Sequence, residues 1–172
     1  MKPNYEWKTA MNLLKIKHLR KGQIKPIQSL MDSNNTLTVA PTSFGKSAIY
    51  QIPALCHSDE LTIVIEPTLS LMHNQVQTLK EHGISADYID HLRKTKDVAA
   101  ILNKVQKGKL TFLYVTPERL QSRHFQEVIR QSNLYMLVID ECHCITEWGY
   151  TFRDAYLKIG NFIDSLPKRP IV

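Results

Sequence analysis

The sequence predicts an α/β protein with a mostly parallel, twisted sheet that helices cover on both faces. Short apolar runs of strand length alternate along the chain with helix-length segments, which is the order that helical crossovers between parallel strands require. The runs are rich in β-branched and aromatic residues and lack polar alternation, as expected for strands buried on both faces. Gly83 and Gly108 stand where C-terminal helix caps belong.

The elements can be placed in order along the chain. We expect strands at residues 36–40, 61–66, 84–89, 110–115 and 134–139. Between them we expect helices at residues 46–57, 69–82, 95–107 and 117–131, the last in one or two pieces. Residues 166–172 are predicted to be a loop that enters a sixth strand, so residues 1–172 are interpreted as one domain truncated at its C-terminal end. Ligands of such sheets bind beyond the C-terminal ends of the strands.

Composition narrows the class of protein. The 172 residues suit one domain, and 43% hydrophobic and 22% charged residues are ordinary values for a globular protein. No apolar run approaches the ~20 residues that span a bilayer, so no membrane partner is expected. The formal net charge of +6 favours a polyanionic partner only weakly. Three cysteines, Cys56, Cys142 and Cys144, argue against a disulfide framework and for a cytoplasmic location.

A phosphate-binding loop is predicted directly after the first strand. Residues 40–47, Ala-Pro-Thr-Ser-Phe-Gly-Lys-Ser, fit the phosphate-loop pattern with alanine in place of its first glycine. Such a loop directs backbone N–H groups and a helix N-terminus at phosphate oxygens. Lys46 is expected to reach the β- and γ-phosphates, Ser47 to bind Mg²⁺, and the bulky Phe44 to point away from the phosphates. The residues expected at the nucleotide are Thr42, Ser43, Phe44, Gly45, Lys46 and Ser47.

An acidic motif follows the strand at residues 134–139. Asp140 is expected to hold Mg²⁺, and Glu141 to polarise the water that attacks the γ-phosphate. His143 is expected to sense the γ-phosphate or a partner domain. A zinc site built on Cys142, His143 and Cys144 is the weaker interpretation, because spacing this short seldom closes a tetrahedral site. Together with the phosphate loop, the acidic pair predicts hydrolysis of ATP or GTP.

Five ordered blocks resemble those of superfamily 2 helicases of the DEAD/DEAH-box type, and RecQ-like helicases most closely. The blocks are residues 19–28, 41–54, 66–76, 114–120 and 140–156. The resemblance covers about residues 13–172 and implies the first RecA-like motor domain of such a helicase, with a second RecA-like domain as its partner. It implies an ATP-dependent DNA helicase that moves 3′ to 5′ along one strand and acts in DNA repair and recombination. RNA remains an alternative substrate.

The resemblance also assigns residues to base and strand contacts. Gln23 would read the adenine edge, Arg20 would stack on the base, and Ile16 stands where relatives carry an aromatic residue. From the residues alone, a solvated N-terminal helix is the alternative for Arg20 and Gln23. Backbone contacts to nucleic acid would come from Thr68, Ser70 and Thr116, and stacking contacts from Trp148, Tyr150 and Arg153. Core packing and an ordinary helix N-terminus at Thr116 are the structural alternatives.

The expected activity depends on the second domain, which in the family supplies arginines to the nucleotide cleft. We therefore expect this chain alone to bind ATP·Mg²⁺ weakly, to hydrolyse it slowly and to unwind nothing. Two rival functions stay open at this point. One is a duplex translocase of the restriction or remodelling kind, and the other is a non-catalytic module that binds nucleotide or nucleic acid.

Overall fold

The computed structural model describes residues 6–41, 43–143, 150–168 and 170–172, with residues 150–153 described by their backbone alone. The strands are β1 (Leu61–Ile65), β2 (Ala86–Ile89), β3 (Phe112–Val115) and β4 (Leu134–Ile139). The helices are α1 (Trp7–Leu13), α2 (Lys21–Met31), α3 (Lys46–Cys56), α4 (Leu69–Glu81), α5 (Thr95–Gln106), η1 (Pro117–Gln121), α6 (Arg123–Arg130), α8 (Tyr150–Leu157) and α9 (Ile159–Asp164). Within this part of the chain, every helix is too short or too polar to cross a membrane.

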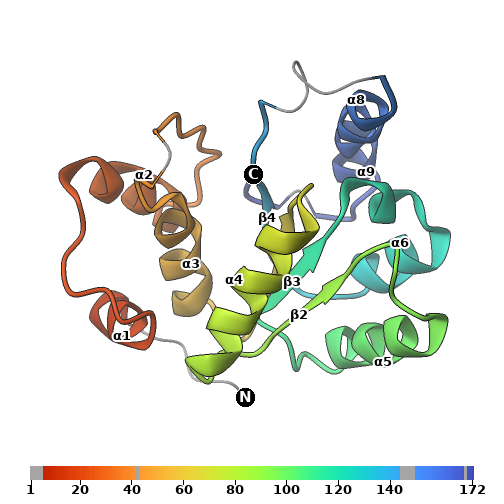
Figure 1. Ribbon diagram of the computed structural model, residues 1–172, viewed down its shortest axis with the longest axis horizontal. Helices are drawn as coiled ribbons and strands as arrows, with labels where there is room; N and C mark the ends of the chain where they lie inside the picture. Colours follow the sequence, from red (N-terminus) through yellow and green to blue (C-terminus); the bar gives the residue numbers. More distant parts are fainter. Residues whose placement is uncertain (1–5, 42, 144–149, 169) are drawn as a thin grey trace.

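The sheet is parallel throughout and has the order β2-β3-β1-β4 (Figure 1). The predicted fold class is therefore confirmed. Gly83 and Gly108 both have a positive φ, 73° and 59°, as a C-terminal helix cap requires. The predicted helix at 117–131 forms as two pieces, because η1 ends at Gln121 and α6 begins at Arg123.

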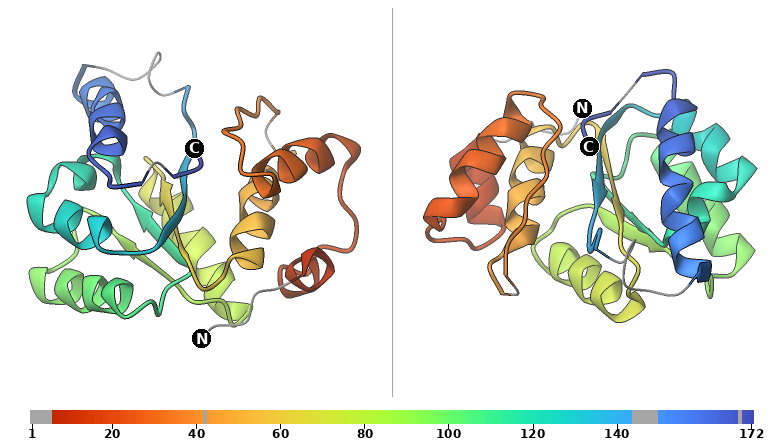
Figure 2. Two further views of the ribbon diagram at one scale, coloured as in Figure 1. Left: turned by 180° about the vertical axis from the view of Figure 1, so that it is seen from behind. Right: turned by 90° about the horizontal axis from the view of Figure 1, so that it is seen from above.

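Helices cover both faces of the sheet, and the two sets lie on opposite sides of the strands in the view from above (Figure 2). Val64 of β1 and Phe112 and Tyr114 of β3 pack with α1–α4, and Ile63 and Leu113 pack with α5, α6, α8 and α9. Successive strand residues point to opposite faces, so these neighbours reach different layers. This three-layer packing explains why the strands carry no polar alternation.

The expected strand at residues 36–40 does not form, which corrects the sequence prediction. Among the described residues, one backbone hydrogen bond joins this segment to the rest of the chain, from Thr36 N to Val172 O at 2.9 Å. The side chains of Leu37 and Val39 are 79% and 92% exposed. The predicted sixth strand is also reduced to a single parallel bridge between Met136 and Ile171. A β-strand forms when a neighbouring chain supplies hydrogen-bond partners along its length. Residues 171–172 supply residues 36–40 with a single backbone partner, at Thr36.

Candidate nucleotide-binding site

The predicted phosphate loop connects residues 36–40 to helix α3. Its turn is closed by a backbone hydrogen bond from Phe44 N to Pro41 O at 3.2 Å. Ser43 and Gly45 adopt left-handed backbone conformations, with φ of 62° and 83°. Gly45 is the N-cap of α3, so the N–H groups of Lys46 and Ser47 open the helix and have no acceptor within it. Thr42 lies outside the described residues.

Two side chains at the start of α2 hold the phosphate loop in place. Arg20 donates from Nη1 to the carbonyl oxygen of Ser43 at 2.6 Å. Gln23 donates from Nε2 to the carbonyl oxygens of Phe44 and Gly45, both at 3.0 Å. Its Oε1 accepts from Arg20 N at 2.8 Å, and the side chain is almost completely buried. The polar atoms of Gln23 are therefore engaged by α2 and the loop.

Phe44 turns toward α2. Its ring centroid lies 5.8 Å from the Arg20 guanidinium carbon, which places a cation over the ring. A Cβ added to Gly22 would lie 2.9 Å from Cζ of Phe44, so the ring is seated directly on Gly22. Ile16 is half-buried and packs against the same apolar cluster as Phe44.

The acidic pair follows β4 and faces Lys46. Nζ of Lys46 lies 3.5 Å from Oε1 of Glu141, and Nδ1 of His143 lies 3.2 Å from Oε2 of the same carboxylate. Asp140 is anchored by its backbone N–H, which donates to Ile65 O of β1 at 3.0 Å. The Asp140 carboxylate in turn accepts from Glu141 N at 2.9 Å. Two motifs far apart in sequence thus meet at one end of the sheet.

Burial raises the pKa of Asp140 above its ordinary value, and the charge of Glu141 raises it further. Hydrogen bonds from Glu141 N and from the Gln75 side chain, together with the charge of Lys46, oppose that rise. Two neighbouring carboxylates with limited access to water are electrostatically unfavourable unless cations compensate them. The acidic pair therefore favours a site that receives positive charge.

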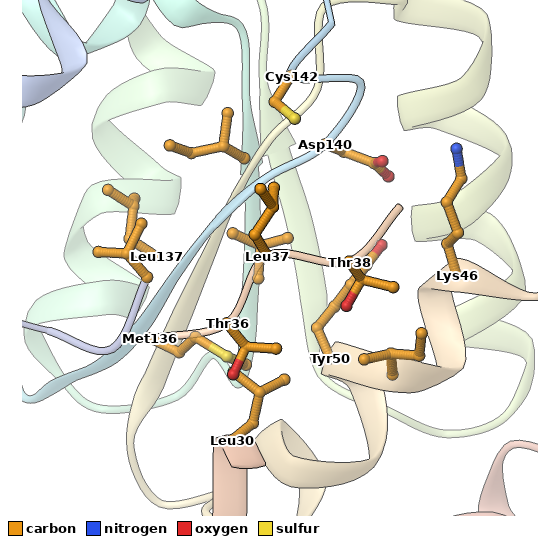
Figure 3. A pocket seen from close by; sticks show the side chains of 14 residues that line it. Leu30, Thr36, Leu37, Thr38, Lys46, Tyr50, Met136, Leu137, Asp140 and Cys142 are labelled. Atoms are coloured by element: carbon orange, nitrogen blue, oxygen red, sulfur yellow. The ribbon is translucent and has the colours of Figure 1, made fainter. Parts of the chain in front are cut away.

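A cavity of about 120 Å³ opens beside these groups. Figure 3 shows the Asp140 carboxylate and the Lys46 amine on facing sides of it, with Thr38 and Tyr50 below them. Ser47 lines a second cavity together with Gln75 of α4. The structure thus places Lys46 and Asp140 at one cavity and Ser47 at another.

The predicted nucleic-acid contacts lie at several places. Thr68 is the N-cap residue of α4 and Ser70 is exposed in the first turn of that helix. Thr116 is buried and precedes η1, which begins with Pro117. Tyr150 and Arg153 belong to the backbone of α8, their side chains are not described, and Trp148 lies outside the described residues.

Several polar side chains near the site were not predicted from the sequence. Glu66 follows β1, is fully buried, and accepts from Thr68 N through Oε1 at 2.9 Å. Its position at the end of an apolar strand is the signal that could have found it, since Asp140 follows β4 in the same way. Tyr50, Gln75 and Tyr114 carry no comparable signal, because only the folded chain brings them together.

The alternative zinc site would be built on Cys142, His143 and Cys144. Among the described residues, no group of three His, Cys, Asp or Glu side chains could hold a metal ion. Cys142 and His143 belong to that part of the chain, and Cys144 lies outside it.

Comparison with known proteins gives a consistent result. The DEAD/DEAH box helicase family matches residues 20–172. The chain is 39% identical over 168 residues to the ATP-dependent DNA helicase RecQ of Haemophilus influenzae, an alignment that covers 95% of this chain and 27% of the relative. It is 38% identical over 154 residues to the enzyme of the same name from Bacillus subtilis, covering 89% and 26%.

Solved structures agree on the fold. The helicase MrfA bound to DNA and AMPPNP superposes with a TM-score of 0.73 at 22% identity, covering 99% of this chain and 26% of that one. A hypothetical ATP-dependent RNA helicase from Sulfolobus tokodaii gives 0.72 at 23% identity, covering 96% and 48%. The chain spans about a quarter of the length of the curated RecQ relatives that it matches. On the match over residues 20–172, the chain belongs to the DEAD/DEAH box helicase family.

Proposed function

We propose that this chain binds ATP with Mg²⁺, and that in the whole protein ATP hydrolysis drives movement along single-stranded DNA and unwinding of a duplex. One observation carries the proposal: the ammonium of Lys46 lies 3.5 Å from the carboxylate of Glu141. That contact brings the phosphate loop and the acidic pair into one site. The RecQ relatives support DNA as the substrate and a second RecA-like domain as the partner.

The residues present suit a magnesium nucleotide. Asp140 offers a carboxylate and Ser47 a hydroxyl, which are the hard oxygen ligands that Mg²⁺ prefers. The burial of Asp140 and the repulsion from Glu141 favour a cation at this point. Bound magnesium would supply positive charge against the developing charge of phosphoryl transfer. The first turn of α3 offers N–H groups to phosphate oxygens.

The chain's own groups then have distinct tasks. Lys46 would exchange its contact with Glu141 for the phosphates, because one ammonium has to serve both partners. Glu141, once released, would orient the attacking water and accept its proton. His143 contacts the second oxygen of Glu141 and would hold that carboxylate in orientation.

The base and strand contacts belong to the same proposal. Gln23 would contact adenine only if its amide gave up at least one of its two bonds to the loop. Arg20 would stack on the base. Thr68 and Ser70 at the start of α4 would contact the sugar–phosphate backbone, with stacking from Trp148, Tyr150 and Arg153. Thr116 before η1 would do so only if its buried side chain became exposed.

A hydrolysis assay on the full-length protein tests the proposal. Glu141→Gln should reduce ATP turnover by at least ~100-fold while ATP binding persists, since general-base catalysis contributes on this order. Glu127→Gln, an exposed change on α6 on the opposite face of the sheet, is the matched control and should leave turnover unchanged. Equal turnover by the wild type and Glu141→Gln would rule out the catalytic assignment and favour a non-catalytic binding module.

Strand displacement separates a helicase from a duplex translocase. The wild-type protein should separate a partial duplex in the presence of ATP, and Lys46→Ala should not. DNA-stimulated ATP hydrolysis without strand separation would instead indicate a translocase that leaves the duplex intact.

A further inference from the structure

Three side chains from three elements meet at one atom beneath the site. The hydroxyl of Tyr50 on α3 donates to Oε1 of Gln75 on α4 at 2.7 Å, and the hydroxyl of Tyr114 on β3 donates to the same oxygen at 3.0 Å. The two hydroxyl oxygens are 3.2 Å apart. Both tyrosines are buried, at 6% and 0% exposure. These contacts join two helices and a strand through two buried hydroxyls and a half-buried amide.

This arrangement decides which way the Gln75 amide faces. A carboxamide has one acceptor oxygen and one donor nitrogen, whereas each tyrosine hydroxyl has a single proton to give. Because the oxygen accepts from both tyrosines, the NH₂ group must face away from them. Burial raises the pKa of Asp140, and hydrogen bonding by the Gln75 side chain opposes that rise. The NH₂ group is the only side-chain donor that Gln75 has for that carboxylate.

The network also reaches the other predicted metal ligand. Ser47 lines one cavity together with Gln75. Burial raises the pKa of Tyr50, one turn further along α3, and hydrogen bonding by the Ser47 side chain opposes that rise. Ser47 connects to Gln75 through Tyr50, and Asp140 connects to Gln75 directly. Gln75 is therefore the shared partner between the two side chains expected to ligate magnesium.

Helix α4 carries both Gln75 and, at its N-terminal end, the residues predicted to contact a nucleic-acid strand. Thr68 is the N-cap residue of the helix, about two turns before Gln75, and Ser70 lies in its first turn. We propose that Gln75 is a positioning residue that orients Asp140 toward the magnesium nucleotide and fixes α4 to it, so that the strand-contacting end of α4 and the nucleotide site adjust together. This inference rests on the proposed function and adds a coupling residue to it.

The first experiment measures magnesium dependence without catalysis. Binding of a fluorescent ATP analogue is titrated with Mg²⁺ in wild-type protein and in Gln75→Glu. The new carboxylate still accepts from both tyrosines, but it cannot donate to Asp140 and it repels that group. Hydrogen bonds to charged groups contribute enough that the half-saturating Mg²⁺ concentration should rise roughly tenfold or more.

Gln77→Glu is the matched control. Gln77 lies on the exposed face of the same helix and bonds Glu81 there, so the variant adds the same charge without touching the network. It should keep the wild-type magnesium requirement. Tyr114→Phe removes one hydroxyl that orients the amide and should raise the requirement by a smaller factor, which provides an independent test if Gln75→Glu folds poorly.

Thermal unfolding distinguishes positioning from a purely structural role. A structural loss would lower the melting temperature equally with and without Mg²⁺·nucleotide. The proposal instead expects Gln75→Glu to lose mainly the part of the stabilisation that Mg²⁺·nucleotide adds. A wild-type magnesium requirement in Gln75→Glu would overturn the inference, whereas failure of the wild type to bind Mg²⁺·ATP would overturn the proposed function itself.

Coupling is measured as a ratio of affinities. A single-stranded oligonucleotide is titrated with and without Mg²⁺·ATP analogue, and the ratio of the two dissociation constants defines the coupling. The ratio should move toward one in Gln75→Glu and stay at the wild-type value in Gln77→Glu. An unchanged ratio in Gln75→Glu would show that α4 responds to nucleotide by another route.

Discussion

At the scale of single residues, the buried carboxylate of Glu66 makes stability depend on pH. Burial raises its pKa from 4.5 to about 7, the charges of Asp140 and Glu141 add to the rise, and hydrogen bonds from Thr68 oppose it. Between these two values the folded protein retains a proton that the unfolded chain releases. This contribution to stability is therefore complete below about pH 4.5 and is lost as the pH rises through about 7.

Glu66→Gln should remove that dependence, because glutamine keeps an acceptor for Thr68 and does not ionise. The fall in unfolding free energy between about pH 5 and about pH 8 should be smaller than in the wild type by up to about 3 kcal/mol. Urea denaturation at the two pH values measures it, with the exposed Glu127→Gln as the control. An identical fall in wild type and Glu66→Gln would mean that Glu66 is ionised throughout.

Gly45 in the phosphate loop has a backbone conformation and a close neighbour that favour glycine. Its φ of 83° strains any residue with a Cβ, and that Cβ would lie 2.7 Å from Nε2 of Gln23. Gly45→Ala should cost roughly 1–2 kcal/mol from the left-handed backbone and should also weaken nucleotide binding as Gln23 is displaced. Gly108→Ala is the control: Gly108 has a φ of 59°, and a Cβ added there would have no atom within 4 Å, so this variant has the backbone strain without a steric clash. Equal nucleotide affinity in both variants would contradict the displacement.

At the scale of elements, α2 supports the phosphate loop through Gln23. Gln23→Ala should lower the affinity for ATP and for GTP, since the loop loses two hydrogen bonds whichever base is bound. Any additional loss for ATP measures the proposed adenine contact. Equilibrium binding of fluorescent ATP and GTP analogues gives both quantities, and an unchanged GTP affinity would exclude the supporting role.

The segment at residues 36–40 is the element that departs from the expected sheet. Among the described residues, no backbone acceptor is found for the amides of residues 37–39, whereas β1 is bonded to strands on both sides. Amide hydrogen exchange should therefore be fast at residues 37–39 and slow in β1. Protection at 37–39 equal to that in β1 would indicate a strand after all.

Features that depend on a local stretch of sequence can be predicted, whereas features that depend on contacts between distant residues cannot. The apolar runs of β1 and β4 are local, so their position and the meeting of Lys46 with Glu141 could be anticipated. The pairing of residues 36–40 depends on a distant neighbour, and an apolar run does not reveal whether that neighbour is present. The shared acceptor at Gln75 is less accessible still, because Tyr50 and Tyr114 contact it only through tertiary packing.

At the scale of the whole molecule, the β4 edge of the sheet is only partly paired. Among the described residues, the outer edge of β4 pairs only with Ile171, through Tyr135 O and Leu137 N in the middle of the strand, and Leu137 N donates to Ile171 O at 2.8 Å. The N–H of Ile139 faces the same way, since bond directions alternate along a strand. The exposed Leu37 lines the cavity together with residues of β4, and the exposed Val39 follows two residues later in the chain. Open edges beside apolar side chains promote pairing between copies.

The 172-residue chain should consequently associate as its concentration rises, and Val39→Lys should reduce that association without lowering the melting temperature, because Val39 is 92% exposed. Light scattering across a concentration series measures the effect. Gln106→Lys, which adds the same charge at an exposed position at the end of α5, is the control for altered charge. Identical association of wild type and Val39→Lys would place the contact elsewhere.

The attachment of the phosphate loop to α2, and not to the sheet, has a mechanical consequence. Arg20 and Gln23 donate hydrogen bonds to three successive carbonyl groups of the loop. Among the described residues, the preceding segment at residues 36–40 has one backbone hydrogen bond to the rest of the chain. A displacement of α2 would therefore act directly on the backbone at residues 43–45. Helix α2 is thus placed to transmit movement of the N-terminal helices to the proposed nucleotide site.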